Sequence, residues 1–332
     1  MLSSFVFAIN AVLPIILMVA IGYILKRIGF ITPEFVKMGN KLVFRIFLPA
    51  MLFLNVYGIE DLAEIDITYV IYAVLATVTM FGIGFAVAIF TTRESGRRAA
   101  LLQGVFRSNY ALIGIPLAGM LFPGEGEAVA TLLSAAIVPV FNVLAVIALS
   151  IFSGDGKKAN FKGIVLGILK NPLILSIMAG LLAIGVRALF VNFDISFRLS
   201  DLTPIYKVLE YLKSLATPLA LIVLGGQFEF SAISSLRREI VTGVAMRCVA
   251  VPTLALGVAY LLFGNRFGGA EFAALSAAFA TPVAVSSVPM AQEMGADVDL
   301  AGQLVVFTTI ASAFTIFITA FIFSLLGVFP AA

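Results

Sequence analysis

Ten predominantly apolar stretches run along the chain, and each is long enough for an α-helix to cross a bilayer core, which takes about 20 residues. They lie near residues 5–25, 36–56, 67–90, 99–122, 128–152, 164–190, 205–228, 240–262, 271–292 and 300–328. Apolar residues make up 61% of the chain and charged residues 12%, about half the share of a soluble domain. The composition excludes a soluble globular protein, a disordered chain and a nucleic-acid binder. It predicts an all-α polytopic membrane protein with ten transmembrane helices.

The residue types that the chain lacks narrow its chemistry. It contains no histidine and one cysteine, Cys248. Histidine is the usual general base and the usual ligand of catalytic zinc, so histidine-dependent and zinc-dependent intramembrane proteases are disfavoured. One thiol cannot form an intrachain disulfide, and Cys248 is expected to be an inert buried group. The sequence also lacks a GxxxxGK[ST] phosphate-binding loop. We therefore expect neither an enzyme nor a cofactor or metal site.

The charges between the spans predict the orientation of the chain. Cations follow the odd-numbered spans, at Lys26, Arg27, Lys37, Arg93, Arg97, Arg98, Lys157, Lys158, Lys162, Arg237 and Arg238. Acidic residues follow spans 2 and 4, at Glu60, Asp61, Glu64, Asp66, Glu125 and Glu127. Because cytoplasmic loops carry an excess of Lys and Arg, both termini are expected outside the cytoplasm. The linker after span 9 is acidic instead, but acidic residues contribute little to this rule.

The two halves of the chain repeat each other. Prolines, glycines and Thr-Pro pairs recur in the same order in spans 1, 2 and 4 and in spans 6, 7 and 9. Each half holds five spans, an odd number, so the second half must cross the membrane in the opposite sense. Such inverted repeats are typical of secondary transporters. The sequence thus predicts two five-helix repeats, residues 1–152 and 164–332, joined by a short cytoplasmic linker, 153–163.

Spans 4 and 9 each contain a proline and small polar residues in the middle. Proline removes a backbone donor and disturbs the preceding turn, and a helix broken in this way is tolerated in a membrane where it lines a polar cavity. Paired broken helices are the best pointer in sequence to a substrate site. The candidate substrate-binding residues are Arg107, Asn109, Tyr110, Gly114, Pro116, Thr281, Pro282, Ser286, Ser287 and Pro289. The alternative is two harmless kinks whose backbone groups are satisfied by Ser and Thr.

Charges within the spans indicate the sign of the substrate. Glu210 and Lys213 are three residues apart and can pair with each other. Arg45, Arg107 and Arg247 have no evident partner in the sequence. A surplus of buried cations suits a carboxylate, which arginine can bind through both oxygens. The alternative is that the side chains extend to the cytoplasmic interface; we favour it for Arg247, weigh it equally for Arg107 and leave Arg45 open.

The chain resembles the auxin efflux carrier family, the bacterial relatives of plant auxin exporters. The resemblance rests on six segments in the family's order, at residues 13–23, 40–53, 108–116, 171–175, 217–225 and 282–293. It implies crossed broken helices in spans 4 and 9, a scaffold of spans 1, 2, 6 and 7 that forms a homodimer, and a transport domain of spans 3–5 and 8–10. It further implies transport of organic anions, such as auxin-like monocarboxylates, malate or malonate, across the cell membrane. Asn109 matches an asparagine that helps to bind substrate in plant relatives, whereas Arg45 departs from the uncharged residue usual there.

Other functions remain open from sequence. A cation/proton antiporter would usually carry Asp at the crossing, where span 4 has Asn109 and span 9 has none. Gln292 and Glu293 follow the span 9 break and could hold a coupling ion, as in related sodium-coupled bile-acid carriers. We prefer a cytoplasmic-end cap for them. We do not favour a channel or a receptor, because the sequence shows no appended soluble domain that would support either function. The anion, the direction of transport and its coupling cannot be read from the sequence.

Overall fold

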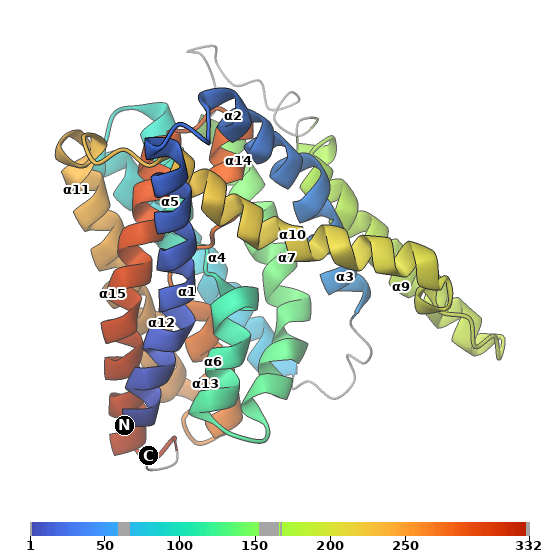
Figure 1. Cartoon of the computed structure of the whole chain (residues 1–332). Coiled ribbons are helices and arrows are strands. Elements are labelled where there is room, and N and C mark those ends of the chain that lie inside the picture. The colour runs from blue at the N-terminus through green and yellow to red at the C-terminus, as the bar shows by residue number, and fades with distance from the viewer. Residues whose placement is uncertain (1, 59–66, 153–165, 167, 330–332) are drawn as a thin grey trace.

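A computed structural model describes residues 2–58, 67–152, 166 and 168–329, and the side chains from residue 13 onward. Its described secondary structure is helical apart from one isolated β-bridge (Figure 1). Seven of the described helices are long and apolar enough to cross a membrane. They span Pro33–Tyr57, Ile67–Thr91, Gly126–Phe152, Pro172–Asn192, Thr203–Gln227, Ala232–Phe263 and Val298–Leu325. This agrees with a polytopic membrane protein, while the ten spans and the inverted repeat stay predictions.

The helices follow the predicted spans closely. Those of the first half are α1 (Leu2–Arg27), α2 (Pro33–Leu42), η1 (Val43–Phe47), α3 (Leu48–Tyr57), α4 (Ile67–Thr91), α5 (Ser95–Phe106), η2 (Tyr110–Gly114), α6 (Ile115–Leu121) and α7 (Gly126–Phe152). Those of the second half are α9 (Pro172–Asn192), η3 (Leu199–Asp201), α10 (Thr203–Gln227), α11 (Ala232–Ala245), η4 (Met246–Ala250), α12 (Val251–Phe263), α13 (Gly269–Phe279), α14 (Ser287–Glu293) and α15 (Val298–Leu325). The predicted linker 153–163 and the acidic residues after span 2 lie outside the described residues.

Three π-helical turns interrupt these helices, and each ends two residues before a proline. The turns η1, η2 and η4 precede Pro49, Pro116 and Pro252, respectively. Proline has no N–H and its ring clashes with the carbonyl four residues back, so the turn before it widens. Pro218 lies inside the continuous α10 without such a turn. The prolines were visible in the sequence, but which of them widen a turn was not.

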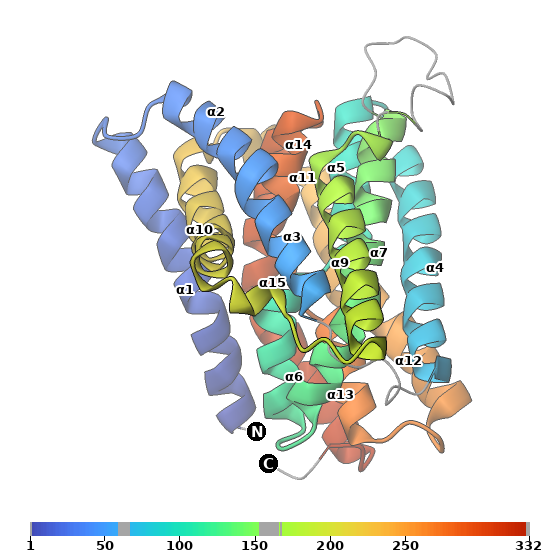
Figure 2. The same ribbon diagram turned by 90° about the vertical axis from the view of Figure 1, so that its right-hand side faces the viewer.

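The first and last described helices have their outer ends at one end of the bundle, and the helix ends that carry cations lie at the other end. The start of α1 and the end of α15 lie together at one end, as Figure 2 shows. The last residues of α1, Lys26 and Arg27, lie at the other end, next to the start of α2. The starts of α5 and α11, which carry further cations, lie there as well. The linker cations at Lys157, Lys158 and Lys162 lie outside the described residues.

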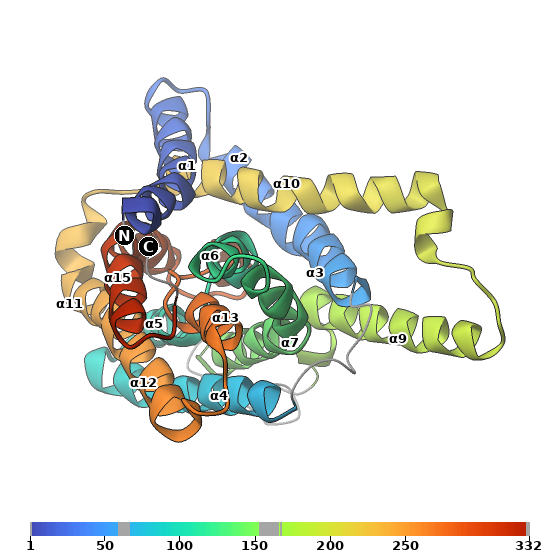
Figure 3. The same ribbon diagram turned by 90° about the horizontal axis from the view of Figure 1, so that it is seen from below.

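The packing places the short helices in the middle of the molecule. Helix α1 packs along α10 and α15, and α3 packs along α9. Helices α4, α5 and α7 pack on one another, and α6 and α13 pack together against α7. The second half of α9 and the first half of α10 project from the other helices, as the view from below shows (Figure 3). The broken helices α5–η2–α6 and α13–α14 are therefore surrounded by long helices, whereas α9 and α10 leave apolar faces exposed.

Candidate functional site at two broken helices

Both predicted breaks are present, and they lie side by side. Helix α5 ends at Phe106 and η2 begins at Tyr110, while α13 ends at Phe279 and α14 begins at Ser287. The extended backbone between them forms an antiparallel bridge between Ser108 and Val283. The Asn109 N–H donates to the Pro282 carbonyl at 2.8 Å, and the Ala284 N–H donates to the Arg107 carbonyl at 3.4 Å. Each break thus supplies hydrogen-bond partners for some backbone N–H and carbonyl groups of the other.

A glycine lets the second broken helix approach the first. A Cβ added to Gly114 would lie 2.9 Å from the Ala277 carbonyl oxygen in α13. Tyr110, beside the break, is buried and donates its hydroxyl to the Ala130 carbonyl of α7 at 2.8 Å. Gly114 and Tyr110 therefore position the segment that follows the break, and the tyrosine hydroxyl already has a partner within the protein.

Arg107 lies in the break itself and does not extend to the interface. Its side chain is buried, with 3% of the residue exposed. One guanidinium nitrogen donates to Asn142 Oδ1 of α7 at 2.7 Å. The other donates to Gln103 Oε1 at 3.2 Å, Ser287 Oγ at 3.4 Å and the Met290 sulfur. Arg107 thus joins α5, α7 and α14 through neutral groups, and the alternative of a surface-reaching side chain is wrong for it.

Arg247 is buried as well, and the expectation that it reaches the cytoplasmic interface is wrong. None of its surface is exposed, and all its hydrogen bonds given by the structure go to backbone carbonyls beside the two breaks. The reason is that the broken helices leave carbonyl oxygens without partners deep in the protein, and a guanidinium satisfies several of them at once. Among the described residues, no ion pair includes Arg107 or Arg247.

Some of the buried polar atoms that lack a hydrogen-bond partner lie at the crossing or beside it. In the described part of the chain, Asn109 Nδ2, Ser108 Oγ and Ser276 Oγ are buried and make no hydrogen bond. Leaving such a group unpaired costs about 1–3 kcal/mol, so each invites a partner that the protein does not supply. Asn109 Nδ2 is a donor, and a carboxylate oxygen is a strong acceptor for it.

The remaining candidate residues differ in how far they are exposed to solvent. Thr281 is fully buried, and its hydroxyl donates to the Ala277 carbonyl at 2.8 Å. Ser287 contacts Arg107, and Pro289 is buried in α14. Pro116 is exposed and Ser286 is half-buried. At the crossing, Arg107 therefore bonds to Ser287, and Asn109 bonds to Pro282. Thr281 and Gly114 lie beside these pairs.

Glu293, expected to cap the cytoplasmic end or to hold a coupling ion, forms an ion pair. Its carboxylate lies 3.2 Å from the Arg45 guanidinium. Arg45, whose role the sequence left open, therefore binds the end of α14. The Arg45 side chain is 60% exposed and that of Glu293 is 14% exposed. Gln292 is half-buried beside it. The pair links η1 to α14, and the coupling-ion role of Gln292 and Glu293 stays a prediction.

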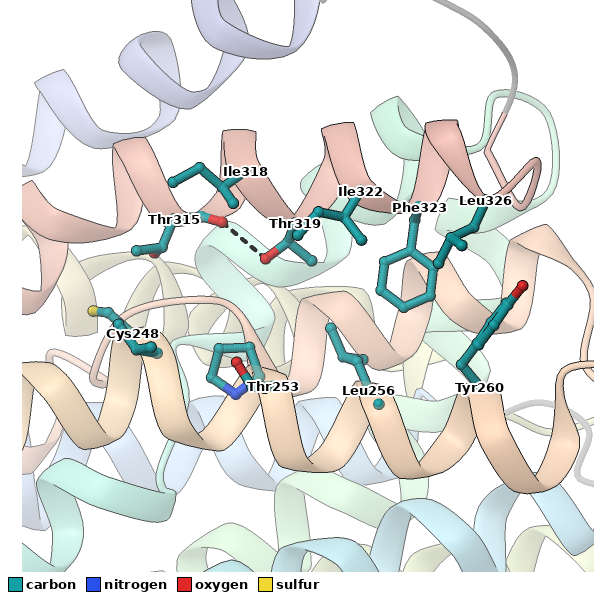
Figure 4. A pocket seen from close by; sticks show the side chains of 13 residues that line it. Cys248, Thr253, Leu256, Tyr260, Thr315, Ile318, Thr319, Ile322, Phe323 and Leu326 are labelled. Atoms are coloured by element: carbon teal, nitrogen blue, oxygen red, sulfur yellow. Dashed lines mark hydrogen bonds between the residues drawn. The ribbon is translucent and has the colours of Figure 1, made fainter.

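A cavity of about 290 Å³ lies elsewhere, between α12 and α15 (Figure 4). Its lining is mostly apolar, with Cys248, Thr253, Tyr260 and Thr319 among the residues that line it. Cys248 is a buried free thiol, as expected. The lining contains no charged residue that could bind an anion, so we do not assign the substrate to this cavity.

Sequence reasoning did not identify several residues of the crossing. Gln103 and Asn142 bind Arg107, and Thr308 accepts the Val283 N–H at 3.1 Å and so supports the second break. Each is a buried polar side chain on a largely apolar helix. That isolated polarity is the signal that could have identified them, since such residues in a membrane need a partner.

Comparison with known proteins identifies the family of the chain. The family described as "Membrane transport protein" matches residues 7–320. An "Uncharacterized transporter" of Methanothermobacter thermautotrophicus is 24% identical over 308 residues, covering 91% of this chain and 94% of the relative. A "Putative malonate transporter" of Rhizobium meliloti is 26% identical over 325 residues, covering 92% of each chain. The chain belongs to the membrane transport protein family, the family of auxin efflux carriers.

Proposed function

We propose that this protein is a secondary carrier of small organic anions that works by alternating access, with its substrate at the crossing of the two broken helices. The observation that carries the proposal is the charge and hydrogen-bonding state of the crossing. Two buried guanidinium groups lie there, no ion pair of the described residues includes either of them, and Asn109 Nδ2 is a buried donor without a partner. A carboxylate would supply the missing negative charge and the missing acceptor.

A small carboxylate is the substrate class that we favour, of the malonate, malate or auxin-like type. The relative named as a "Putative malonate transporter" supports this class, since it aligns with the chain over 92% of its length. A dicarboxylate has a second charged end, and Arg107 offers a guanidinium two residues from Asn109. An amide donor and a guanidinium at this spacing suit such an anion better than a neutral solute.

We further propose that α1, α2–α3, α9 and α10 form a scaffold and a homodimer interface, while α4–α7 and α11–α15 move with the substrate. Helix α10 supports the dimer. Lys207, Glu210 and Lys213 are exposed on it although it is long and apolar enough to cross a membrane. Charges that face lipid are costly, and a second copy on this face would cover them. We place the protein in the cell membrane with both termini outside the cytoplasm, on the evidence of the linker cations.

A sodium- or proton-coupled symporter or antiporter is the alternative. It would need an acidic or amide group that is free to hold the ion, and Glu293 is the nearest candidate that the sequence offers. Its ion pair with Arg45 argues against that use. We therefore favour an anion carrier whose driving force does not depend on Glu293.

Uptake into proteoliposomes tests the proposal. Labelled malonate, malate and indole acetate are offered to wild type, Asn109→Ala and the matched amide variant Asn55→Ala, which lies in α3 away from the crossing. We expect saturable uptake of at least one of the three anions by wild type. Loss of one hydrogen bond to a charged group costs about 1.5–3 kcal/mol, so Asn109→Ala should raise KM about 10- to 100-fold. No uptake of any of the anions, or equal KM values in Asn109→Ala and wild type, would contradict the proposal.

A further inference from the structure

Arg247 is the largest side chain that is completely buried in the described part of the protein. It lies on η4, the π-helical turn between α11 and α12, four spans after the first break and one span before the second. At the proposed substrate site its positive charge attracts the anion, which does not explain its hydrogen bonds. A fully buried guanidinium in a membrane protein needs a reason to be there, because the charge is costly in this environment.

The hydrogen bonds of Arg247 reach both broken helices. Its Nε donates to the Thr281 carbonyl at 2.7 Å, and one Nη donates to the Ala278 carbonyl at 3.0 Å. Ala278 is in the last turn of α13, and Thr281 lies two residues after the helix ends. The other Nη donates to the carbonyls of Val105 and Phe106 at 3.3 and 3.2 Å, at the end of α5. One side chain from a third helix thus holds the ends of two half-helices together.

These carbonyls need an outside donor for a reason that is visible in the sequence. In a continuous helix, the Ala278 carbonyl would accept from residue 282, which is a proline without an N–H. The Val105 carbonyl would accept from the N–H of Asn109, but that N–H donates to Pro282 across the crossing. The same break that creates the crossing therefore frees the acceptors that Arg247 binds.

The positive charge of Arg247 is also favourable beside the ends of α5 and α13. The ends of α5 and α13 are C-terminal helix ends, which carry partial negative charge and are stabilised by a nearby cation. In other carriers with broken helices, carbonyls at such half-helix ends coordinate the coupling cation. Here the Arg247 guanidinium donates hydrogen bonds to four carbonyl oxygens at or just beyond these helix ends.

We propose that Arg247 is a positioning residue that acts as the fixed cation of the crossing, holding the two half-helix ends in register in place of a bound metal cation. This deepens the proposed function, on which it rests for the identity of the transported anion. It implies that the geometry of the crossing depends on the guanidinium itself, and that sodium is not needed to assemble the site. An arginine that only fills space would have neither consequence.

Hydrogen exchange of the backbone amides of Asn109 and Ala284 tests the proposal without any substrate. These two amides form the bonds between the breaks, so their exchange reports whether the crossing is closed. Wild type is compared with Arg247→Ala, Arg247→Lys and the control Arg107→Ala. The control also removes a buried arginine at the crossing, but one whose hydrogen bonds in the structure go to side chains.

We expect Arg247→Ala to speed exchange at both amides by at least about tenfold and millimolar guanidinium chloride to reverse much of this change. Arg247→Lys, which keeps the charge with fewer donors, should fall between wild type and Arg247→Ala, and it serves as the main variant if Arg247→Ala does not fold. Arg107→Ala, which removes side-chain bonds to α7 and α14, should speed exchange at both amides less than Arg247→Ala does. Unchanged exchange in the Arg247 variants, or equal loss of protection in Arg107→Ala, would overturn the proposal.

A sodium comparison separates this proposal from the anion proposal. Thermal unfolding and anion uptake of wild type are measured in sodium chloride and in choline chloride, and we expect equal values in the two salts. A requirement for sodium in wild type would overturn the fixed-cation role, because the carbonyls are already taken. Failure of every anion to be transported would contradict the proposed substrate class but leave the exchange result, and hence the role of Arg247, intact.

Discussion

Arg107 and Arg247 lie at the same crossing, but their guanidinium groups meet different partners. Arg107 binds side chains of Gln103, Asn142 and Ser287, whereas Arg247 binds backbone carbonyls. Sequence could predict that both are unusual, because charge in a membrane span is rare. It could not predict that Arg247 is buried, since its partners come from two segments that lie more than 30 residues away along the chain.

The ion pair of Arg45 and Glu293 leads to a prediction about coupling. Both side chains retain some exposure, so the pair should contribute less than about 1 kcal/mol to stability. We expect Arg45→Ala and Glu293→Ala to change the rate of anion uptake to a similar degree, and the double variant to add little to either. Uptake rates of the four proteins, measured in sodium and in choline buffer, check this. If Glu293 held a coupling ion, its removal would abolish an ion dependence that Arg45→Ala leaves in place.

Gly114 gives a second prediction at the residue scale. Its missing Cβ leaves room for the Ala277 carbonyl, so Gly114→Ala should push η2 away from α13 at a cost of about 1–3 kcal/mol. Anion uptake should fall strongly while the protein still folds. The control is Gly82→Ala in α4, where an added Cβ meets no atom within 4 Å. Uptake by Gly114→Ala equal to that by Gly82→Ala would show that this close approach is not needed.

The breaks of spans 4 and 9 are the part of the fold that sequence predicted best at the scale of elements. Pro282 and the small polar residues around it placed the second break correctly, between α13 and α14. The π-helical turns were not predicted, because a proline can also be accommodated without one, as Pro218 is in α10. The antiparallel bridge of Ser108 and Val283 was not predicted either, since it depends on how two distant segments pack.

The contact of α1 with α10 can be tested in the same way. A Cβ added to Gly225 would clash with the Val19 carbonyl oxygen, and one added to Gly22 would clash with the Ile222 carbonyl oxygen. Small residues let membrane helices approach closely, so Gly225→Ala should separate the two helices and lower the melting temperature. Gly185→Ala, in an open position on α9, should keep or raise it, since alanine favours the helix by about 0.5–1 kcal/mol. Thermal unfolding in detergent measures both, and equal values would contradict the close contact.

At the scale of the whole molecule, sequence predicted a polytopic helical membrane protein of a transporter family, and both statements hold. Apolar periodicity and composition are enough for this, because the bilayer dictates helix length and backbone satisfaction. The separation into scaffold and transport domains, the homodimer and the orientation in the membrane stay predictions. They depend on a second copy of the chain, on motion and on the lipid, none of which a single chain contains.

The central claim is that an organic anion binds at the crossing, and protection of a cysteine there tests it most directly. Ala111, two residues after Asn109, is exposed, so Ala111→Cys in a Cys248→Ala background offers a thiol beside the proposed site. Ser235→Cys, at the exposed start of α11, is the control. We predict that the transported anion slows alkylation of the cysteine at position 111 and leaves the cysteine at position 235 unaffected. Equal alkylation at position 111 with and without an anion that the same protein transports would contradict the account.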